Sequence, residues 1–356
     1  MNLERPGIAL IGCGQIAANC HLPGIQASPF ALRAVCDAER ERVERFKREQ
    51  NLDASVAVCT SLDEILKLDG VQAVSIATPP ASHAPLSIRA LDAGKHVLCE
   101  KPSTLSASEN RAVCAAVARN PGLTIQFFSS RFRDGAAPAA RRFVREGRLG
   151  VPYKADIQFW LPAARTCDRG GPPWFGQKAH AGGGPFMDMG QYFLDRLFFI
   201  LGWPRWRRLS AQTFSGFPTG NPPGVVYDVE DHMSLLAHFD GGLALTLETT
   251  ARVNQHYRWS TTVAGSAGTL ILDNAAPRRA VFRALKDGVP VEEDLEAPES
   301  APDMQARLER LALRLKGERP ELGTDHEQAL YITEFCEAAY RSAAEGRELR
   351  APEEAA

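Results

Sequence analysis

The chain has 356 residues, of which 44% are hydrophobic and 24% charged, and its formal net charge is −2. This length predicts two domains, with cores large enough to fold without disulfides or structural metal ions. The near-zero charge argues against a general affinity for nucleic acid or for an anionic membrane, because either partner would require a basic surface.

The eight cysteines are scattered along the chain, and none forms a CxxC pair. Together with the dispersed histidines, this spacing predicts no metal site. The polar start Met1–Pro6 and the short apolar run that ends before Gly12 do not resemble a signal peptide, and no stretch is long enough to span a membrane. Unpaired cysteines are typical of a reducing compartment, so the expected location is the cytoplasm.

The first third of the chain alternates short apolar runs with helix-like segments. The apolar runs predict buried strands over Ile8–Ile11, Leu32–Cys36, Val71–Ala77, His96–Cys99 and Thr124–Phe128. The segments between them predict helices over Glu39–Gln50, Ser61–Leu66, Ala84–Ala93 and Ser106–Arg119. Ser61 and Ser106 each stand three residues before a glutamate, the spacing of a capping box. This alternation predicts an α/β domain with parallel strands joined by helical crossovers.

The pattern changes after Ser129. Helices are predicted over Ala136–Glu146, Pro185–Leu201 and Glu327–Ala344, and strands over Tyr153–Trp160, Ser234–Phe239, Leu243–Ala251, Trp259–Val263 and Thr269–Leu272. Asp240-Gly241-Gly242 predicts a hairpin turn. Arg205–Arg208 is expected to be a solvated loop, Ala297–Glu321 a charged helix-prone segment with weak packing, and Arg350–Ala356 a frayed end. This part predicts an α+β domain with an open, mostly antiparallel sheet.

A glycine-rich motif follows the first predicted strand directly. Residues 12–17 read GCGQIA, which matches GxGxxA at the strand–helix turn where a dinucleotide-binding fingerprint belongs. Gly12 permits the tight turn, Gly14 lets the backbone approach the pyrophosphate, and Ala17 allows close packing of helix and strand. We therefore expect Gly12, Gly14, Gln15 and Ile16 to contact a nicotinamide dinucleotide.

Asp37 follows the second predicted strand, twenty residues after Ala17. An acidic residue there accepts hydrogen bonds from the adenosine ribose and repels a 2′-phosphate, which favours NAD over NADP. The alternative is that Asp37 only caps the helix that follows. Arg40 and Arg42 lie nearby and would weaken the exclusion of NADP.

Several further motifs occur together. Thr78-Pro79-Pro80 ends a predicted strand with His83 three residues later, residues 93–102 read AGKHVLCEKP, and Gly182-Gly183-Gly184 precedes Asp188 and Tyr192. In this series the chain resembles the glucose–fructose oxidoreductase, inositol dehydrogenase and rhizopine-catabolism (Gfo/Idh/MocA) family. The resemblance covers nearly the whole chain and is most specific at Glu100-Lys101-Pro102. It implies a Rossmann domain over 1–128 and an α+β domain over 129–356 that serves substrate binding and whose open sheet mediates oligomerisation.

The resemblance implies a catalytic role for Lys101, at the carboxyl edge of the sheet where ligands bind in open α/β folds. A lysine beside a cationic nicotinamide would take the proton of a hydroxyl as the hydride leaves. Glu100 is expected to support Lys101 or to contact the nicotinamide ribose, and a structural carboxylate is the alternative. Pro102 is linked in this family to an unusual peptide geometry.

The predicted helix after Pro185 places Asp188 and Tyr192 four residues apart, hence on one face. Asp188 matches the family pattern, whereas a histidine is commoner at the place of Tyr192. With an ordinary pKa of about 10, tyrosine is a poorer base than histidine. Tyr192 either hydrogen-bonds the reacting oxygen or shares proton transfer with Lys101, unless its hydroxyl only meets Asp188 or solvent.

The remaining candidates line the two ends of the expected site. Thr78, Pro79 and His83 are expected at the nicotinamide, with a buried structural histidine as the alternative for His83. Arg131 is expected near the substrate. Trp174 and Phe175 could form a sugar-stacking wall or plug the domain seam.

These features predict an NAD(H)-dependent dehydrogenase that acts on a hydroxyl-bearing carbon of a sugar or cyclitol. One alternative keeps NAD tightly bound and oxidises the sugar only transiently, as in a glycosidase or a sugar–sugar oxidoreductase. Another is a nucleotide-dependent binding or regulatory protein without turnover. An antiparallel sheet with one uncovered face predicts a homodimer or homotetramer.

Overall fold

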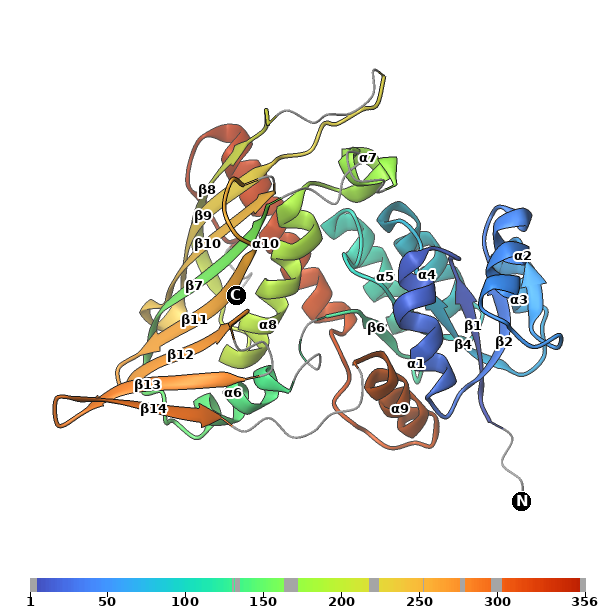
Figure 1. Ribbon diagram of the computed structural model, residues 1–356, viewed down its shortest axis with the longest axis horizontal. Helices are drawn as coiled ribbons and strands as arrows, with labels where there is room; N and C mark the ends of the chain where they lie inside the picture. Colours follow the sequence, from blue (N-terminus) through green and yellow to red (C-terminus); the bar gives the residue numbers. More distant parts are fainter. Residues whose placement is uncertain are drawn as a thin grey trace. The chain divides into compact units, whose positions relative to one another are not determined.

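The computed structural model describes residues 5–129, 131, 135–162, 172–217, 224–251, 253–275, 279–295 and 303–352. The chain divides into two compact units (Figure 1). The first comprises Met1–Phe128 and Ser300–Tyr331, and the second comprises Ser129–Glu299 and Ile332–Ala356. Residues 300–331, which the sequence-based division placed in the second domain, thus belong to the first unit.

A parallel sheet forms the centre of the first unit. In the part of the chain that the structure describes, it has six strands in the order β3-β2-β1-β4-β5-β6. The strands are β1 (Gly7–Ile11), β2 (Ala31–Cys36), β3 (Ala57–Cys59), β4 (Val71–Ile76), β5 (His96–Cys99) and β6 (Ile125–Phe127). This is the order of a dinucleotide-binding fold, and the direction of winding reverses between β1 and β4. The predicted α/β class is confirmed.

The helices of the first unit follow the predicted crossovers. They are η1 (Ala17–His21), α1 (Leu22–Gln26), α2 (Arg40–Glu49), α3 (Leu62–Leu66), η2 (Pro80–Ser82), α4 (His83–Asp92), α5 (Ala107–Arg119) and α9 (Asp303–Leu315). One half of each predicted capping box is present, because the hydroxyls of Ser61 and Ser106 accept the N–H groups of Glu64 and Glu109 at 3.4 and 3.2 Å. The two glutamate side chains accept the N–H groups of Thr60 and Leu105, one residue before each serine. Each serine therefore fixes the residue at which its helix begins.

The predicted weak packing of Ala297–Glu321 is wrong for α9. Its residues Met304, Leu308 and Leu311 are buried in one core with Leu22 and Ile25 of α1. A Cβ on Gly24 of α1 would lie 2.3 Å from the Met304 Cγ atom, so glycine is what lets the two helices approach. The apolar face of α9 was hidden in the sequence by arginines at neighbouring positions.

A larger sheet dominates the second unit. Among the described residues it has nine strands in the order β14-β13-β12-β11-β7-β10-β9-β8-β15. They are β7 (Pro152–Leu161), β8 (Trp206–Phe214), β9 (His232–Phe239), β10 (Ala244–Ala251), β11 (Arg258–Gly265), β12 (Gly268–Asp273), β13 (Ala280–Lys286), β14 (Val289–Leu295) and β15 (Leu349–Arg350). Neighbouring strands are antiparallel except for the parallel pair β7 and β10, so the predicted α+β architecture is confirmed.

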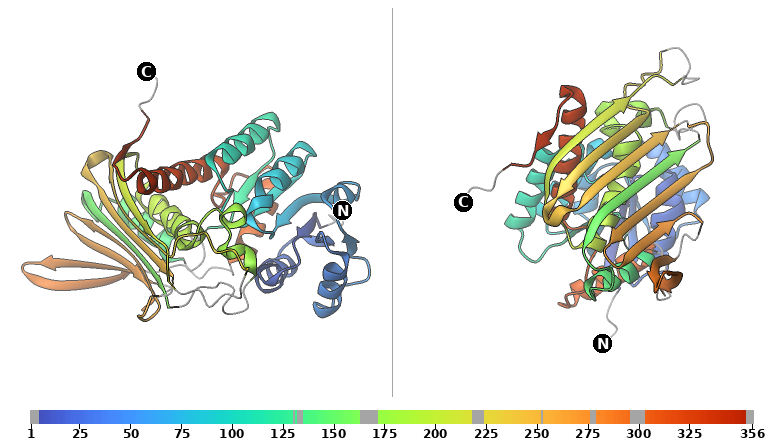
Figure 2. Two further views of the ribbon diagram at one scale, coloured as in Figure 1. Left: turned by 90° about the horizontal axis from the view of Figure 1, so that it is seen from above. Right: turned by 90° about the vertical axis from the view of Figure 1, so that its left-hand side faces the viewer.

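Helices cover one face of this sheet. They are α6 (Ala136–Arg145), η4 (Pro173–Gly176), α7 (Lys178–Ala181), η5 (Phe186–Gly190) and α8 (Gln191–Leu201), followed by α10 (His326–Glu345), which begins in the first unit and continues in the second. Phe335 of α10 packs on Phe198 of α8 and Phe239 of β9, with ring centroids 5.7 and 6.0 Å apart. The right-hand view of Figure 2 shows the strands in front, with α8 in green and α10 in red behind them.

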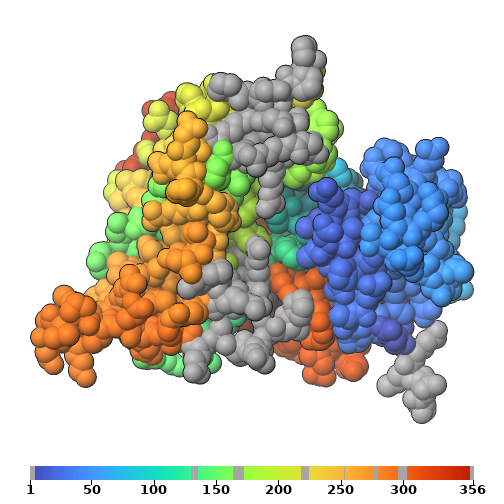
Figure 3. Space-filling view, viewed as in Figure 1, coloured from blue at the N-terminus to red at the C-terminus, as the bar shows by residue number. Residues whose placement is uncertain are grey.

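The structure corrects two expectations in this unit and adds one hairpin that was not predicted. Arg207 and Arg208 lie in β8 rather than in a loop, with their side chains exposed and paired with Asp240 and Glu348. Leu349–Arg350 pairs with β8 as β15 instead of fraying, whereas residues 353–356 lie outside the described part. The β13–β14 hairpin, in orange in Figure 3, was not predicted because β14 is almost entirely exposed and neither strand shows a regular alternation of apolar and polar residues.

The predicted hairpin at Asp240–Gly242 does connect β9 to β10, through a short 3₁₀ turn η6. Gly241 and Gly242 both have positive φ values, of 72° and 81°. Among the described helices, none combines the length and the apolar composition needed to cross a lipid bilayer.

Candidate functional site

The glycine-rich turn lies where β1 ends, at the centre of the parallel sheet. Gly12 has φ 98°, and a Cβ there would lie 2.4 Å from the Ala77 carbonyl oxygen, so the turn requires glycine. Gly14, by contrast, would place a Cβ in open space, with no atom within 4 Å. Protein packing therefore accounts for Gly12, and the space over Gly14 is free for a ligand.

The turn fits a dinucleotide. Gly14, Gln15 and Ile16 are exposed, and Ile16 has 46% of its surface accessible although it is a large apolar residue. The helical segment η1 begins immediately afterwards, so its first backbone N–H groups and the positive end of its dipole face the same side as this turn. An exposed, glycine-containing turn before a helix is the site that a pyrophosphate requires.

Asp37 holds this turn from the end of β2. Its Oδ2 atom accepts the N–H of Cys13 at 3.1 Å, and its Oδ1 atom accepts the N–H of Glu39 at 3.3 Å. Arg42 lies 3.4 Å from the same Oδ1 atom and 2.7 Å from Glu39. Asp37 thus fixes the glycine turn and holds the residue before α2, but the N-cap of α2 is Glu39, so these contacts do not make Asp37 the cap of that helix.

The loop after β4 begins with accessible residues and ends at a buried histidine. Thr78 is partly exposed and Pro79 is exposed. His83, in contrast, is fully buried, with Nδ1 2.8 Å from the Pro102 carbonyl oxygen and Nε2 2.9 Å from that of Thr78. Burial lowers the pKa of His83, which favours a neutral ring that donates to one of the two carbonyls. These contacts correspond to the alternative of a buried structural histidine, which ties the Thr78 loop to the turn at Pro102.

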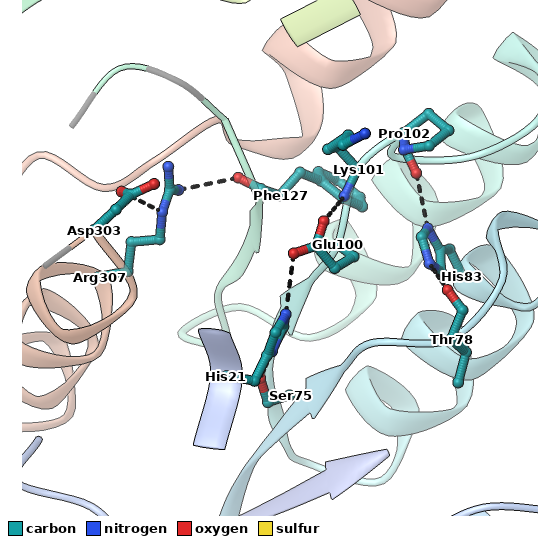
Figure 4. A network of polar contacts seen from close by, with 10 residues as sticks. All are labelled: His21, Ser75, Thr78, His83, Glu100, Lys101, Pro102, Phe127, Asp303 and Arg307. Carbon is teal, nitrogen blue, oxygen red and sulfur yellow. Dashed lines mark hydrogen bonds and ion pairs between the residues drawn. The ribbon is translucent and has the colours of Figure 1, made fainter. Parts of the chain in front are cut away.

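The turn after β5 carries Glu100, Lys101 and Pro102. Glu100 is 5% exposed, Lys101 is partly exposed, and the Lys101–Pro102 peptide bond is cis. The Glu100 Oε1 atom lies 3.1 Å from His21 Nε2, and its Oε2 atom accepts the Lys101 N–H at 2.9 Å (Figure 4). Burial alone would raise the pKa of the Glu100 carboxyl, but its contacts with His21 and Lys101 lower it below the ordinary value. Glu100 is therefore a paired anion beside Lys101.

In the second unit, the helix that was predicted over Pro185–Leu201 begins with a π-helical turn. Asp188 lies in this turn, η5, and is partly buried, whereas Tyr192 lies in the first turn of α8 and is 6% exposed. The Asp188 N–H donates to the Gly184 carbonyl oxygen at 2.9 Å. Single π-helical turns inside helices are frequent at functional sites because they displace side chains from the regular spacing.

The glycines before this helix have a structural explanation that sequence reasoning missed. A Cβ on Gly183 would lie 2.1 Å from the Tyr340 hydroxyl, and one on Gly184 would lie 1.9 Å from the Glu230 carbonyl oxygen. These two glycines make room for neighbours inside the protein, and close approach to a ligand is not needed to explain them.

Glu230 fixes the start of the helix. Its Oε2 atom accepts the Gly184 N–H at 2.8 Å, and its Oε1 atom accepts the Phe186 N–H at 3.1 Å and the Tyr340 hydroxyl at 2.9 Å. Burial raises the pKa of Glu230 despite these three donors. No spacing in the sequence could have indicated this residue, since it is 46 residues from Gly184.

Arg131 is buried rather than open to a substrate. Only 1% of its surface is accessible, and its Nε atom donates to both Asp195 oxygens at 3.0 and 2.9 Å. Its guanidinium also lies over the rings of Phe199 and Trp203, at 5.1 and 5.0 Å. These contacts make Arg131 an anchor of α8 through Asp195, which explains the polar position of Asp195 on an apolar helix.

Trp174 and Phe175 form a stacked aromatic pair in η4, in which each ring keeps one outer face. Their rings stack on each other with centroids 4.0 Å apart and planes 17° apart. Both side chains are partly exposed. A flat, accessible aromatic surface suits contact with the apolar face of a sugar ring.

The structure thus assembles two groups of candidates. The first unit places Gly12, Gly14, Asp37, Thr78, Pro79 and Lys101 at the carboxyl ends of β1, β2, β4 and β5. The second unit places Asp188 and Tyr192 on one helix. Among the residues that the structure describes, no group of three or more His, Cys, Asp or Glu side chains is arranged to hold a metal ion.

Comparison with known proteins identifies both units. Residues 7–127 match the GFO/IDH/MocA oxidoreductase family model, which describes an NAD-binding Rossmann fold, and residues 138–271 match the GFO/IDH/MocA C-terminal domain. The D-glucoside 3-dehydrogenase of Escherichia coli (strain K12) is 30% identical over 258 residues, which are 69% of this chain and 70% of that protein. The first unit is therefore an NAD-binding Rossmann domain.

Two solved structures are similar over almost the entire chain. The aldose-aldose oxidoreductase from Caulobacter crescentus, complexed with glycerol, is 26% identical with a TM-score of 0.81 over 98% of this chain and 100% of that chain. GenD2 from gentamicin A biosynthesis, in complex with NAD, is also 26% identical, with a TM-score of 0.80 over 99% of this chain and 97% of that chain.

The contacts of Glu230 predict that Glu230→Gln destabilises the protein. An amide has a single acceptor oxygen, so either the Gly184 or the Phe186 N–H would face an NH₂ group inside the protein, at a cost of about 1–3 kcal/mol. Urea unfolding followed by circular dichroism measures this loss. Glu318→Gln, at an exposed position after α9, removes the same charge and should leave stability unchanged. Equal stability of the two variants would contradict the assignment.

Proposed function

The chain belongs to the GFO/IDH/MocA oxidoreductase family, and we propose that it transfers a hydride between NAD(H) and a hydroxyl-bearing carbon of a sugar, cyclitol or sugar derivative. The observation that carries the proposal is the partly exposed Lys101, which follows β5 at the same edge of the sheet as the glycine turn and Asp37. The similarity to a D-glucoside 3-dehydrogenase supports a sugar as the substrate class.

The glycine turn and Asp37 would hold the cofactor. The exposed backbone of Gly14, Gln15 and Ile16 would bind the pyrophosphate, and Asp37 would accept hydrogen bonds from the adenosine ribose. Each Asp37 oxygen has lone pairs beyond those used by Cys13 and Glu39. Its negative charge favours NAD over NADP, although Arg42 offsets part of that charge. When bound, the nicotinamide supplies the acceptor or donor of the hydride.

Lys101 would exchange the proton. In the oxidation direction, its neutral amine takes the proton of the substrate hydroxyl while the hydride leaves the same carbon, so that the C–OH group becomes a carbonyl. In the reduction direction, the ammonium returns the proton to the oxygen. The Glu100 carboxylate accepts the backbone N–H of Lys101, and the His83 ring contacts the carbonyl oxygen of Pro102, the residue after Lys101. Thr78 and Pro79 would border the nicotinamide.

Asp188 and Tyr192 would bind the reacting hydroxyl, the former by accepting a hydrogen bond and the latter through its own hydroxyl. We assign the proton to Lys101 because its amine would lie beside the cationic nicotinamide, whose positive charge favours the neutral form of the amine. The stacked Trp174 and Phe175 rings would bind the face of the sugar. Arg131, through Asp195, would hold the helix that carries these residues without contacting the substrate.

A second candidate is a sugar–sugar oxidoreductase or a glycosidase that keeps NAD bound and oxidises its substrate only transiently. Two observations favour it: a tyrosine stands at position 192, and an aldose-aldose oxidoreductase is similar over the whole length of the chain. Such an enzyme produces no net NADH. This distinguishes it from a dehydrogenase that releases its cofactor.

We further propose a cytoplasmic location. The cysteines in the described part of the chain, which excludes Cys167, are all free thiols. Free thiols persist in reducing compartments.

Substitution of Lys101 tests the proton-transfer role. Lys101→Ala should lower kcat by about 10²–10⁴-fold, the usual contribution of a general acid–base group. Lys67→Ala, at an exposed position of the same unit, is the matched control and should leave turnover unchanged. NAD binding, measured by quenching of tryptophan fluorescence, should persist in both variants. Turnover near the wild-type rate in Lys101→Ala would refute the role.

The uncovered face of the second unit's sheet predicts a homodimer or homotetramer. Leu236 and Phe214 are 42% and 50% exposed, and Leu236 lines a hollow of about 500 Å³ together with Gln158, Ser234 and Thr246. Sedimentation at micromolar concentration should detect an oligomer, and Leu236→Lys should weaken it. The control Leu285→Lys, at a leucine that is 72% exposed on β13, should leave the oligomer unchanged. A wild-type monomer would refute this proposal.

A further inference from the structure

A histidine that the proposed reaction leaves unused lies fully buried beside the catalytic turn. His21 has no accessible surface, and both of its ring nitrogens have side-chain partners. Nδ1 lies 2.8 Å from the Ser75 hydroxyl oxygen in β4, and Nε2 lies 3.1 Å from Glu100 Oε1. An apolar residue would fill such a position at a lower desolvation cost. We therefore expect His21 to act through its hydrogen bonds and not by filling space in the core.

The contacts continue from His21 to Lys101. Glu100 uses one oxygen for the His21 ring and the other for the Lys101 N–H, at 2.9 Å. Figure 4 shows this path from Ser75 through His21 and Glu100 to the backbone of Lys101. Since a carboxylate is planar and rigid, the direction of its Oε2 atom is set by what its Oε1 atom contacts. The orientation of Glu100, and with it the Lys101 peptide, thus depends on His21.

His21 also belongs to the nucleotide-binding segment. It is the last residue of η1, the π-helical segment that begins right after the exposed turn at Gly14–Ile16. The π geometry is closed by the Leu22 N–H, which donates to the Ala17 carbonyl oxygen. One short helical segment therefore has the dinucleotide turn at its start and the Glu100 contact at its end.

We propose that His21 is a positioning residue that fixes Lys101 through Glu100 and joins the nucleotide-binding turn to the proton-transferring group. The proposal rests on the catalytic role proposed for Lys101. His21 does not touch the substrate. It acts by holding the Glu100 carboxylate in one orientation and in its ionised form.

The electrostatics give the proposal a pH signature. The titratable groups that face Glu100 are His21, Lys101, His83 and Cys99. Burial would raise the pKa of Glu100, and His21 is the main group that lowers it. Without the His21 contact, the Glu100 pKa should rise. The acid limb of the pH–rate profile should then move to higher pH, because Glu100 loses its charge earlier as the pH falls.

Two substitutions separate the contacts of the ring. The amide nitrogen of glutamine reaches the place of the imidazole Nε2 atom, so His21→Gln keeps a donor to Glu100. The amide of asparagine lies near the place of Nδ1, so His21→Asn keeps a partner for Ser75 and loses the contact with Glu100. Both replace a buried ring by an amide and should lower thermal stability by similar amounts, which makes each the control for the other.

We expect His21→Asn to lower kcat by about a hundredfold, the size of effect that a small misplacement of a reacting group produces. Its acid limb should shift to higher pH, while its affinity for NAD stays within a few-fold of wild type. His21→Gln should restore most of kcat and the wild-type pH profile. If His21→Asn does not fold, Ser75→Ala, which frees the ring without removing it, should show the same changes on a smaller scale.

Hydrogen–deuterium exchange at the Lys101 amide provides a readout that does not depend on turnover. Exchange should be faster in His21→Asn than in His21→Gln, because only the former releases the Glu100 carboxylate. Equal exchange, equal kcat and equal pH profiles in the two variants would overturn the inference. If Lys101→Ala remains active but the exchange difference is present, the proposed role of Lys101 fails and the positioning contact stands.

Discussion

A carboxylate removed from water must receive hydrogen-bond donors or a positive charge, and three buried carboxylates in this chain do so by holding functional segments. Glu100 holds the backbone of Lys101, Glu230 holds the start of the helix that carries Asp188, and Asp195 holds Arg131. Their accessible fractions are 5%, 7% and 2%, so solvent cannot replace the partners. These contacts hold the Lys101 N–H, the Gly184 N–H and the Arg131 side chain.

Backbone groups are assigned to the cofactor phosphates, whereas side chains are assigned to the substrate hydroxyl. The exposed glycine turn offers backbone N–H groups at the start of a helix, which suits a charged phosphate group. The groups assigned to the substrate hydroxyl are side chains of intermediate or low exposure, namely Lys101, Asp188 and Tyr192. A low exposure strengthens hydrogen bonds to a reacting oxygen, since water competes less for the same donors and acceptors. The buried carboxylates are what hold such side chains in place at little exposure.

Much of the fold could be predicted because its strands are apolar and its helices have local start signals. Ser61 and Ser106 begin α3 and α5 as their spacing predicted, and the strand–helix alternation indicated the parallel sheet. The elements that were missed lack such local features. Strand β3 has three residues, too few for a periodic pattern. Helix α9 was expected to be helical, but its packing was missed because arginines interrupt its apolar face.

The candidate site was predictable only where its motifs are local. The glycine turn, Asp37 and the Glu100-Lys101-Pro102 segment stand at strand ends, and the structure places them there. Long-range partners were not predictable: Glu230 meets Gly184 across 46 residues, and Arg131 meets Asp195 across 64. The burial of His83 is of the same kind, because it depends on a carbonyl 19 residues away. Such contacts come from tertiary packing and leave no spacing in the sequence.

The proposed function requires that the protein bind NAD and use it to oxidise a sugar or polyol. The most direct test is mass spectrometry of the denatured, untreated protein for bound nucleotide, together with a panel of sugars and polyols followed at the absorbance band of NADH. We expect the denatured protein to release NAD and at least one sugar or cyclitol to produce NADH. Bound NAD without any net NADH would favour the enzyme that keeps NAD bound and oxidises its substrate transiently. The absence of both bound nucleotide and NADH formation would contradict the proposed function.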